Sequence, residues 1–264
     1  MMTSPPKQIR PVLPILIFCL SFILISTVQA ADSFELGNQA YMHNNFSQAI
    51  KYYQQTAAQR GFSSALLYNM GNSYAQLGRA GQAILAYEQA LRLDHGDPDI
   101  RTNLASIRKK NGIYQQDQSW WRRTADFLGT DQWLLLATIS FFSFCSCFLL
   151  IVLLQKPSIT TRLLKVVSIS ALVIAVLSLP PALYGYLHWH DAVVLTRTRL
   201  KISPFAESAT TGILAEGRIV HPLKNYRNFI LVRDTTGRKG WLAAGELGFI
   251  DRLEPKVGSM PATQ

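Results

Sequence analysis

The chain has 264 residues, of which 48% are hydrophobic and only 16% are charged, and its net charge is +10. Soluble domains average about 25% charged residues, so this composition predicts that part of the chain lies in lipid. The basic residues are spread thinly and form no dense stripe, which argues against nucleic acid as a partner. The three cysteines all lie in apolar segments, a placement that argues against a disulfide-stapled secreted domain.

Residues 1–30 have the pattern of a signal peptide. Lys7 and Arg10 precede an apolar stretch from Val12 to Ile25, and small residues follow it. Two alternatives stay open: the segment is kept as an uncleaved signal anchor, or Cys19 is the lipidated residue of a lipoprotein. In each case the following chain is expected outside the cytoplasm.

Residues 31–112 repeat with a period of 34 residues. The period relates pairs of identical residues: Gly37 and Gly71, Asn38 and Asn72, Ala49 and Ala83, and Tyr53 and Tyr87. The small residues let two helices approach closely, and the tyrosines fill the space between them. Gly78 is expected to turn the chain between the helices of one repeat. This period, with the segment from Leu67 to Gly78, resembles the tetratricopeptide family, and a partial third copy adds a capping helix.

That resemblance implies an all-α solenoid whose first helices line a groove for extended peptides. Six side chains match the groove positions: Asn38, Tyr41, Asn69, Asn72, Gln76 and Asn103. An asparagine side chain can donate to and accept from a peptide backbone at once. The alternative is that these residues only solvate a helix face. Some members clamp a C-terminal carboxylate with cations, but Phe34 and Asn103 occupy cation positions here, so carboxylate capture is not expected.

Residues 113–130 are expected to form an interfacial linker before two membrane spans, at 131–155 and 166–189. Each span exceeds the roughly 20 residues that a helix needs to cross the hydrocarbon layer. Neither the stretch from Trp133 to Leu154 nor the second span contains Asp, Glu, Lys or Arg. Charges inside the membrane mark most ion and proton pathways, so a transporter or pump is disfavoured.

The connector between the spans, residues 156–165, contains three basic residues and no acid. Basic loops favour the cytoplasmic side, so the soluble segments on both sides of this hairpin are expected outside. Basic residues also stand at the outer ends of the spans. The signal peptide therefore carries the topology prediction more than the connector does.

Residues 190–253 change to short strand-like segments separated by turns, of which Asp234–Gly237 is one. Five short strands in about 60 residues predict a small all-β barrel. Residues 254–264 are expected to form a flexible tail.

The β segment is similar to bacterial SH3-like domains in three stretches: Leu214–Val220, Phe229–Val232 and Gly237–Leu242. The resemblance implies binding of cell-wall peptides or of other proteins. The candidate binding residues are three aromatics, each of which suits the core equally well: Tyr226, Phe229 and Trp241.

No recognisable catalytic motif or phosphate-binding glycine loop occurs, so neither an enzyme nor a bound cofactor is expected. His188, His190 and Asp191 cluster at the end of the second span. Their placement favours a polar cap on an aromatic belt over a metal site.

The predicted fold is a multidomain membrane protein: an all-α tetratricopeptide solenoid, a transmembrane helical hairpin and a small all-β SH3-like barrel. This order resembles the E-type proteins of the Bat (Bacteroides aerotolerance) operons. The resemblance implies a scaffold in the bacterial inner membrane with both soluble domains in the periplasm. Its implied partners are von Willebrand A-domain membrane proteins and a MoxR-type ATPase, in stress tolerance or the maturation of envelope proteins.

Two other functions stay open. The chain is a cell-wall sensor or tether whose SH3-like domain binds peptidoglycan peptides, or it is a regulatory subunit of a membrane enzyme or channel.

Overall fold

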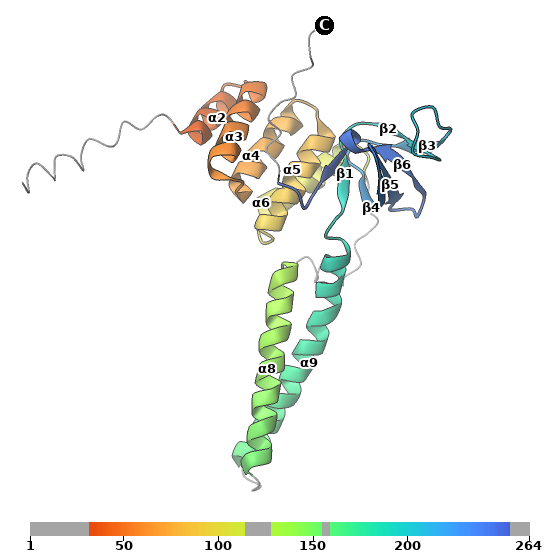
Figure 1. The fold of residues 1–264 in the computed structure, drawn as a ribbon. Coiled ribbons are helices and arrows are strands. Elements are labelled where there is room, and N and C mark those ends of the chain that lie inside the picture. Colours follow the sequence, from red (N-terminus) through yellow and green to blue (C-terminus); the bar gives the residue numbers. More distant parts are fainter. Residues whose placement is uncertain (1–31, 114–127, 155–158, 254–264) are drawn as a thin grey trace, which may run out of the picture.

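The computed structural model describes residues 32–113, 128–154 and 159–253, which form a head on a long helical hairpin (Figure 1). The head combines a group of helices with a curled β-sheet, and the two hairpin helices extend from it side by side. The predicted signal peptide, most of the predicted linker and the predicted tail lie outside the described residues.

The repeat region is helical, as the 34-residue period predicts. Its helices are α2 (Ser33–Met42), α3 (Phe46–Arg60), α4 (Ser64–Gln76), α5 (Ala80–Leu93) and α6 (Pro98–Lys110). Polar side chains bond the free N–H groups at the start of four of them: Asp32, Asn45, Ser63 and Asp97. Gly78 has a φ of +72° and makes the turn between α4 and α5, which confirms its predicted role.

Small residues allow the helices of each pair to touch. A Cβ atom at Gly37 would lie 2.4 Å from Cε1 of Tyr53, and one at Gly71 would lie 2.7 Å from Cε1 of Tyr87. Both tyrosines are buried. The predicted packing of large residues against glycine is therefore confirmed in both repeats.

The C-terminal segment is a curled antiparallel half-barrel. Its strands are β1 (Ala192–Val194), β2 (Thr198–Lys201), β3 (Thr210–Leu214), β4 (Ile219–Tyr226), β5 (Phe229–Asp234), β6 (Lys239–Ala243) and β7 (Leu247–Phe249). They form one seven-stranded sheet in the order β3-β2-β6-β5-β4-β1-β7. The core on its inner side contains Val194, Leu200, Val232 and Leu242 among other apolar residues.

The prediction of five strands was wrong, because it missed β2 and β3. The sequence of β2 is Thr-Arg-Leu-Lys, in which only Thr198 and Leu200 are buried. Two buried positions give a weak alternation signal, so the pairing with β3 and β6 defines this strand. The half-barrel also remains open, since β3 and β7 are the two edges of the sheet.

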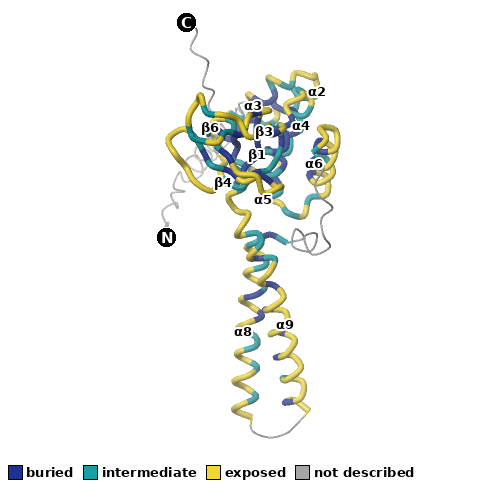
Figure 2. The backbone as a smooth tube through the Cα atoms, turned by 90° about the vertical axis from the view of Figure 1, so that its right-hand side faces the viewer, coloured by how far each residue is buried: buried dark blue, intermediate teal, exposed yellow. Residues whose placement is uncertain are grey.

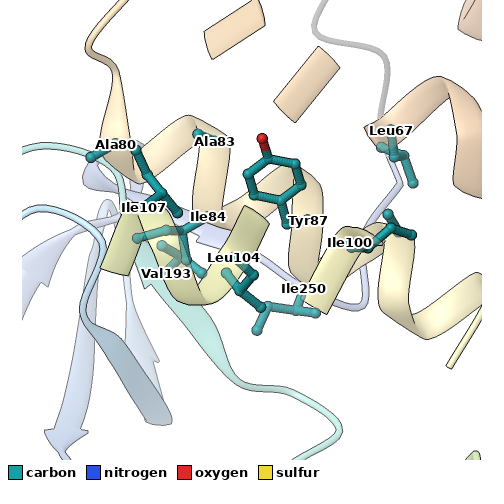
Figure 3. Close-up of a cluster of buried hydrophobic side chains, with 11 residues drawn as sticks. Leu67, Ala80, Ala83, Ile84, Tyr87, Ile100, Leu104, Ile107, Val193 and Ile250 are labelled. Atoms are coloured by element: carbon teal, nitrogen blue, oxygen red, sulfur yellow. The ribbon is translucent and has the colours of Figure 1, made fainter. Parts of the chain in front are cut away.

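The repeat region and the half-barrel share one hydrophobic core. Val193 of β1 and Ile250, just after β7, lie in the same buried cluster as Ile84 of α5 and Leu104 of α6 (Figure 3). The sequence presents two separate domains, with α6 alone closing the repeats. The structure corrects this, because side chains of the half-barrel complete the core at the end of the solenoid, where such an array needs a cap.

Glycines bring the two parts of the head into backbone contact. A Cβ atom at Gly81 in α5 would lie 2.5 Å from the carbonyl oxygen of Leu195. From the other side, Gly217 faces the side chain of Ile84, and Gly248 faces that of Leu85. Larger residues at these positions would separate α5 from the sheet.

The half-barrel also caps α5. Arg79, at the N-cap position, makes no side-chain hydrogen bond to the helix. The N–H of Gly81 instead donates to Oε1 of Glu216 at 2.7 Å. A carboxylate suits this place, because the first N–H groups of a helix are unpaired and carry partial positive charge. Gln89 of the same helix donates to the carbonyl oxygens of Phe249 and Arg252.

The hairpin consists of α8 (Thr130–Leu154) and α9 (Ile159–Leu187), both long and apolar enough to cross a membrane. Most of their surface is exposed, as Figure 2 shows, and it is rich in large apolar side chains. Small residues face the seam between the helices: Ala137, Ser140, Ser168, Ala171, Ala175, Ser178 and Ala182. Small residues at helix contacts are typical of membrane helices, and the hairpin indicates membrane association.

The second span begins earlier than predicted. The expected connector was 156–165, but α9 starts at Ile159 and takes in Arg162 and Lys165. Long basic side chains are tolerated at the end of a membrane helix, because their charged heads can reach the headgroup region. The charge boundary in the sequence therefore does not mark the helix boundary.

In the sequence the hairpin is inserted between the two parts of the head, and Figure 1 shows both parts together at one end of it. The chain leaves the repeat region at Ile113 and enters β1 at Ala192. Because both parts share a core, they must stand on the same side of any membrane that α8 and α9 cross. Two crossings satisfy this condition and one would not.

A single methyl group at Gly81 should loosen the head. We expect Gly81→Ala to destabilise the fold by about 1–3 kcal/mol, because the new Cβ meets the backbone of Leu195 and not a flexible side chain. The measurement is the free energy of unfolding of the full chain in detergent. Gly245→Ala is the matched control, since a Cβ atom there meets nothing within 4 Å. Equal stability of the two variants would contradict the shared core.

Candidate functional site

The six predicted groove residues all lie on the first helices of the helix pairs. Asn38 and Tyr41 are on α2, Asn103 is on α6, and the other three are on α4. Gln76 is exposed, and the remaining five are partly exposed. We call this set, Asn38, Tyr41, Asn69, Asn72, Gln76 and Asn103, the repeat groove.

Two of the asparagines accept hydrogen bonds inside the repeat region. The hydroxyl of Tyr53 donates to Oδ1 of Asn38 at 2.9 Å, and Nδ2 of Asn69 donates to the same oxygen at 3.1 Å. A buried tyrosine hydroxyl needs a partner, and this asparagine supplies it.

The same arrangement recurs one repeat later. The hydroxyl of Tyr87 donates to Oδ1 of Asn72 at 2.7 Å, and Nδ2 of Asn103 donates to it at 3.0 Å. Each unit ties the second helix of one pair to the first helices of two adjacent pairs. Sequence reasoning assigned these asparagines to ligand binding and missed this role. The signal was present, because the tyrosines and the asparagines share the 34-residue spacing.

The repeat groove still has unused hydrogen-bonding atoms. Within the described residues, Oδ1 of Asn69 and Nδ2 of Asn72 make no hydrogen bond, and neither does the side chain of Gln76. The rings of Tyr41 and Phe46 pack edge to face with centroids 5.3 Å apart. The groove therefore offers amide groups and aromatic edges that remain available to a peptide.

The predicted aromatic residues of the half-barrel point away from its core. In β5 and β6 the buried residues alternate with Phe229 and Trp241, which are partly exposed. The ring of Tyr226 lies edge-on to that of Trp241 and to that of Phe205, with centroids 6.4 Å apart in both pairs. Sequence reasoning missed Phe205, which has a 56% exposed side chain in the β2–β3 connection.

These aromatics belong to one surface, which we call the outer sheet face. It consists of the outward side chains on β2, β4, β5 and β6: Arg199, Lys201, His221, Lys224, Tyr226, Phe229, Leu231, Arg233, Lys239 and Trp241. It is separate from the contact with the repeat region, which uses β1 and β7.

Two histidine–aspartate pairs lie at the joint between the hairpin and the head, one with His190 just after α9 and one with His221 of β4. Nδ1 of His190 lies 2.6 Å from Oδ2 of Asp251, and Nδ1 of His221 lies 2.8 Å from Oδ1 of Asp191. Burial raises the pKa of Asp191 and outweighs the opposing effect of the hydrogen bond from His221. Among the described residues, no group of three or more His, Cys, Asp or Glu side chains is arranged to hold a metal ion.

The repeat region also reaches this joint. The guanidinium of Arg92 lies 4.2 Å from the ring centroid of Trp189 and donates to its carbonyl oxygen at 2.6 Å. These two contacts connect the end of the hairpin to α5.

The hydroxyl of Tyr53, which is bonded to Asn38, should lose its proton at a higher pH than an ordinary tyrosine. Burial, with smaller contributions from Tyr41 and Glu35, raises the pKa of Tyr53 from 10.0 to about 12. Since this pKa is raised in the fold, the neutral phenol contributes stability below pH 10.0, and that contribution is lost as the pH rises toward about 12. In an alkaline titration followed by tyrosinate absorbance, Tyr53→Phe should reduce the absorbance change that occurs between pH 10.0 and about 12.

The same substitution should cost about 0.5–1.5 kcal/mol of unfolding free energy, because Asn38 loses one donor and keeps Asn69. If the lost absorbance change instead lies near the pKa of an ordinary tyrosine, or if the free energy of unfolding is unchanged, the hydrogen bonds among Tyr53, Asn38 and Asn69 are not formed as described.

Comparison with known proteins bears on the repeat region alone. A family model described as a TPR repeat matches residues 67–112, which include most of α4, all of α5 and all of α6. No curated protein sequence matches this chain. The helices α2 and α3 lie before the match and follow the same spacing and packing. The chain therefore contains a TPR repeat region, two long apolar helices and a curled antiparallel half-barrel, and the repeats indicate that it binds other proteins.

Proposed function

We propose that this chain is a membrane-anchored adaptor, and not an enzyme, that holds protein partners beside a bacterial inner membrane. One observation carries the proposal: the TPR repeats and the half-barrel share a core, and this single head stands on a hairpin of two long apolar helices. A head of this kind presents its binding surfaces at a set distance from the bilayer. Partners held together there have a raised effective concentration for one another.

The repeat groove is the principal binding surface in this proposal. It lies on α2, α4 and α6, while the half-barrel packs against α5. The half-barrel makes no hydrogen bond to any of the six groove side chains within the described residues. An extended peptide can therefore approach the groove with the head intact.

The proposed sidedness rests on sequence patterns, and the proposed partners rest on the resemblance in the order of segments. The signal peptide and the basic connector support a periplasmic head. The order of segments supports a role in a Bat-type complex, with von Willebrand A-domain membrane proteins as partners and stress tolerance as the process. The second candidate is a cell-wall sensor, which the exposed aromatics of the outer sheet face favour.

Two exposed glutamines provide a matched test of the groove. Gln76 lies on α4 in the repeat groove, and Gln55 lies on α3, a second helix of a pair. A photo-crosslinking amino acid at Gln76 is expected to give adducts with a membrane protein in cells, and the same residue at Gln55 is not. Mass spectrometry identifies the adduct. Equal adducts from both positions, or none from Gln76, would rule out the groove as the binding surface.

Cysteine labelling tests the sidedness. The starting variant has serine at all three cysteines, Cys19, Cys145 and Cys147, of which the last two lie in α8. Thr235→Cys then marks the head and Thr160→Cys marks the far end of the hairpin, both at exposed positions. In intact spheroplasts a membrane-impermeant maleimide should label the head, and should label the hairpin end only after permeabilisation. The reverse pattern would place the head in the cytoplasm and end the periplasmic proposal.

A further inference from the structure

We propose that the outer sheet face binds an extended acidic peptide segment of a protein partner. This inference rests on the adaptor function proposed above and names the chemistry of one of its ligands. It is carried by the charges on this face, by the pairing of its strands and by its exposed aromatics.

The strand register places an apolar centre between two cations. Lys224 pairs with Leu231, Leu231 with Trp241, and Trp241 with Lys201. Side chains directly opposite each other across a sheet lie on the same face. One row thus runs across β4, β5, β6 and β2 with a lysine at each end.

The neighbouring row adds two more cations. Arg233 of β5 pairs with Lys239 of β6, and both side chains are exposed. Like charges placed directly opposite each other repel and destabilise a sheet. Within the described residues neither has an ion-pair partner, and neither does Lys224. A bound anion would relieve this repulsion.

The carboxylates of Asp234 and Glu246, near the outer sheet face, bond to other groups of the half-barrel and do not neutralise its cations. Asp234 is buried and accepts hydrogen bonds from Thr236 and from Nε of Arg238. Glu246 accepts from the backbone N–H of Ala243 at 3.1 Å. No outward position of β2, β4, β5 or β6 carries an acidic residue. The carboxylate of Asp191 borders the face, because its Oδ1 lies 2.8 Å from Nδ1 of His221, which pairs with Arg233, and it is thereby engaged with that histidine.

A cleft of about 440 Å³ adjoins this face at Lys201. It is lined by three cations and two carboxylates, Arg197, Arg199, Lys201, Glu207 and Glu246, so its charge is mixed. Nζ of Lys201 is also occupied, since it donates to the carbonyl oxygen of Ala206 at 2.6 Å. The carboxylates of the ligand are therefore assigned to Lys224, Arg233 and Lys239, and not to the cleft.

The exposed aromatics define the rest of the ligand. Tyr226 is 39% exposed and forms an edge-to-face chain between Phe205 and Trp241. Such rings take apolar or proline side chains, and the four strands span about 15 Å at a spacing near 4.8 Å. That length suits roughly four residues of extended peptide at 3.3 Å each. A short segment with apolar residues between acids fits both the charge and the size.

The test uses the full chain in detergent and a fluorescein-labelled peptide with glutamates on both sides of a central Pro-Leu-Pro. Fluorescence anisotropy is expected to show binding of this peptide and not of the same peptide with glutamine in place of glutamate. The face variant is Lys224→Glu with Lys239→Glu, and it should raise the Kd about tenfold or more. The matched control, Lys51→Glu with Lys110→Glu, changes the net charge equally on the exposed repeat surface and should leave the Kd unchanged.

Tyr226→Ala tests the apolar part and should also weaken binding, since the ring is exposed and its loss spares the core. Unfolding curves should show that every variant is fully folded under the conditions of the binding measurement. The proposal is overturned if the two charge variants bind alike, if the glutamine peptide binds as well, or if nothing binds. It is also overturned if soluble muropeptides or short-chain phosphatidylglycerol displace the peptide, which would assign the face to the wall or to lipid.

Failure of this inference can be distinguished from failure of the adaptor function. Crosslinking from Gln76 reports on the repeat groove, on the other part of the head. Adducts from Gln76 without binding of the acidic peptide would support the adaptor function and contradict only the proposal that the outer sheet face binds an acidic segment.

Discussion

The contact between α5 and the strands β1 and β7 governs the architecture of this protein. It is a backbone-level contact, because glycines at 81 and 248 stand where a Cβ atom would meet Leu195 and Leu85. Glu216 and Gln89 add hydrogen bonds across it, and Val193 and Ile250 complete the core of the repeats. The repeat region and the half-barrel, which the hairpin separates in the sequence, thus fold as one head. The hairpin is an insertion into this head and does not link independent domains.

A single head has consequences for binding. Two modules on a flexible tether would sample many orientations, whereas these surfaces have a set relation to each other and to the bilayer. Arg92, Trp189 and the histidine–aspartate pairs extend this order to the end of α9.

The asparagines of the repeat groove serve two purposes at once. Asn38 and Asn72 satisfy buried tyrosine hydroxyls through one atom, and among the described residues Nδ2 of Asn72 and Oδ1 of Asn69 have no partner. Replacing all of them with alanine would disturb folding and binding together, because a buried hydroxyl would lose its partner. Ligand binding is better tested at Gln76, which takes no part in the network.

The sequence alone determined the repeats, the spans and most strands, because each depends on local periodicity: 34 residues between Tyr53 and Tyr87, unbroken apolarity in α8 and α9, and alternation in β5 and β6. It could not determine β2, the start of α9 or the union of repeats and half-barrel. Those features depend on partners distant in sequence: β6 for β2, and the sheet for α5. Nothing in the sequence pattern around Gly81 or Glu216 indicates a contact between them. They acquire their roles only when folding brings them 2.7 Å apart.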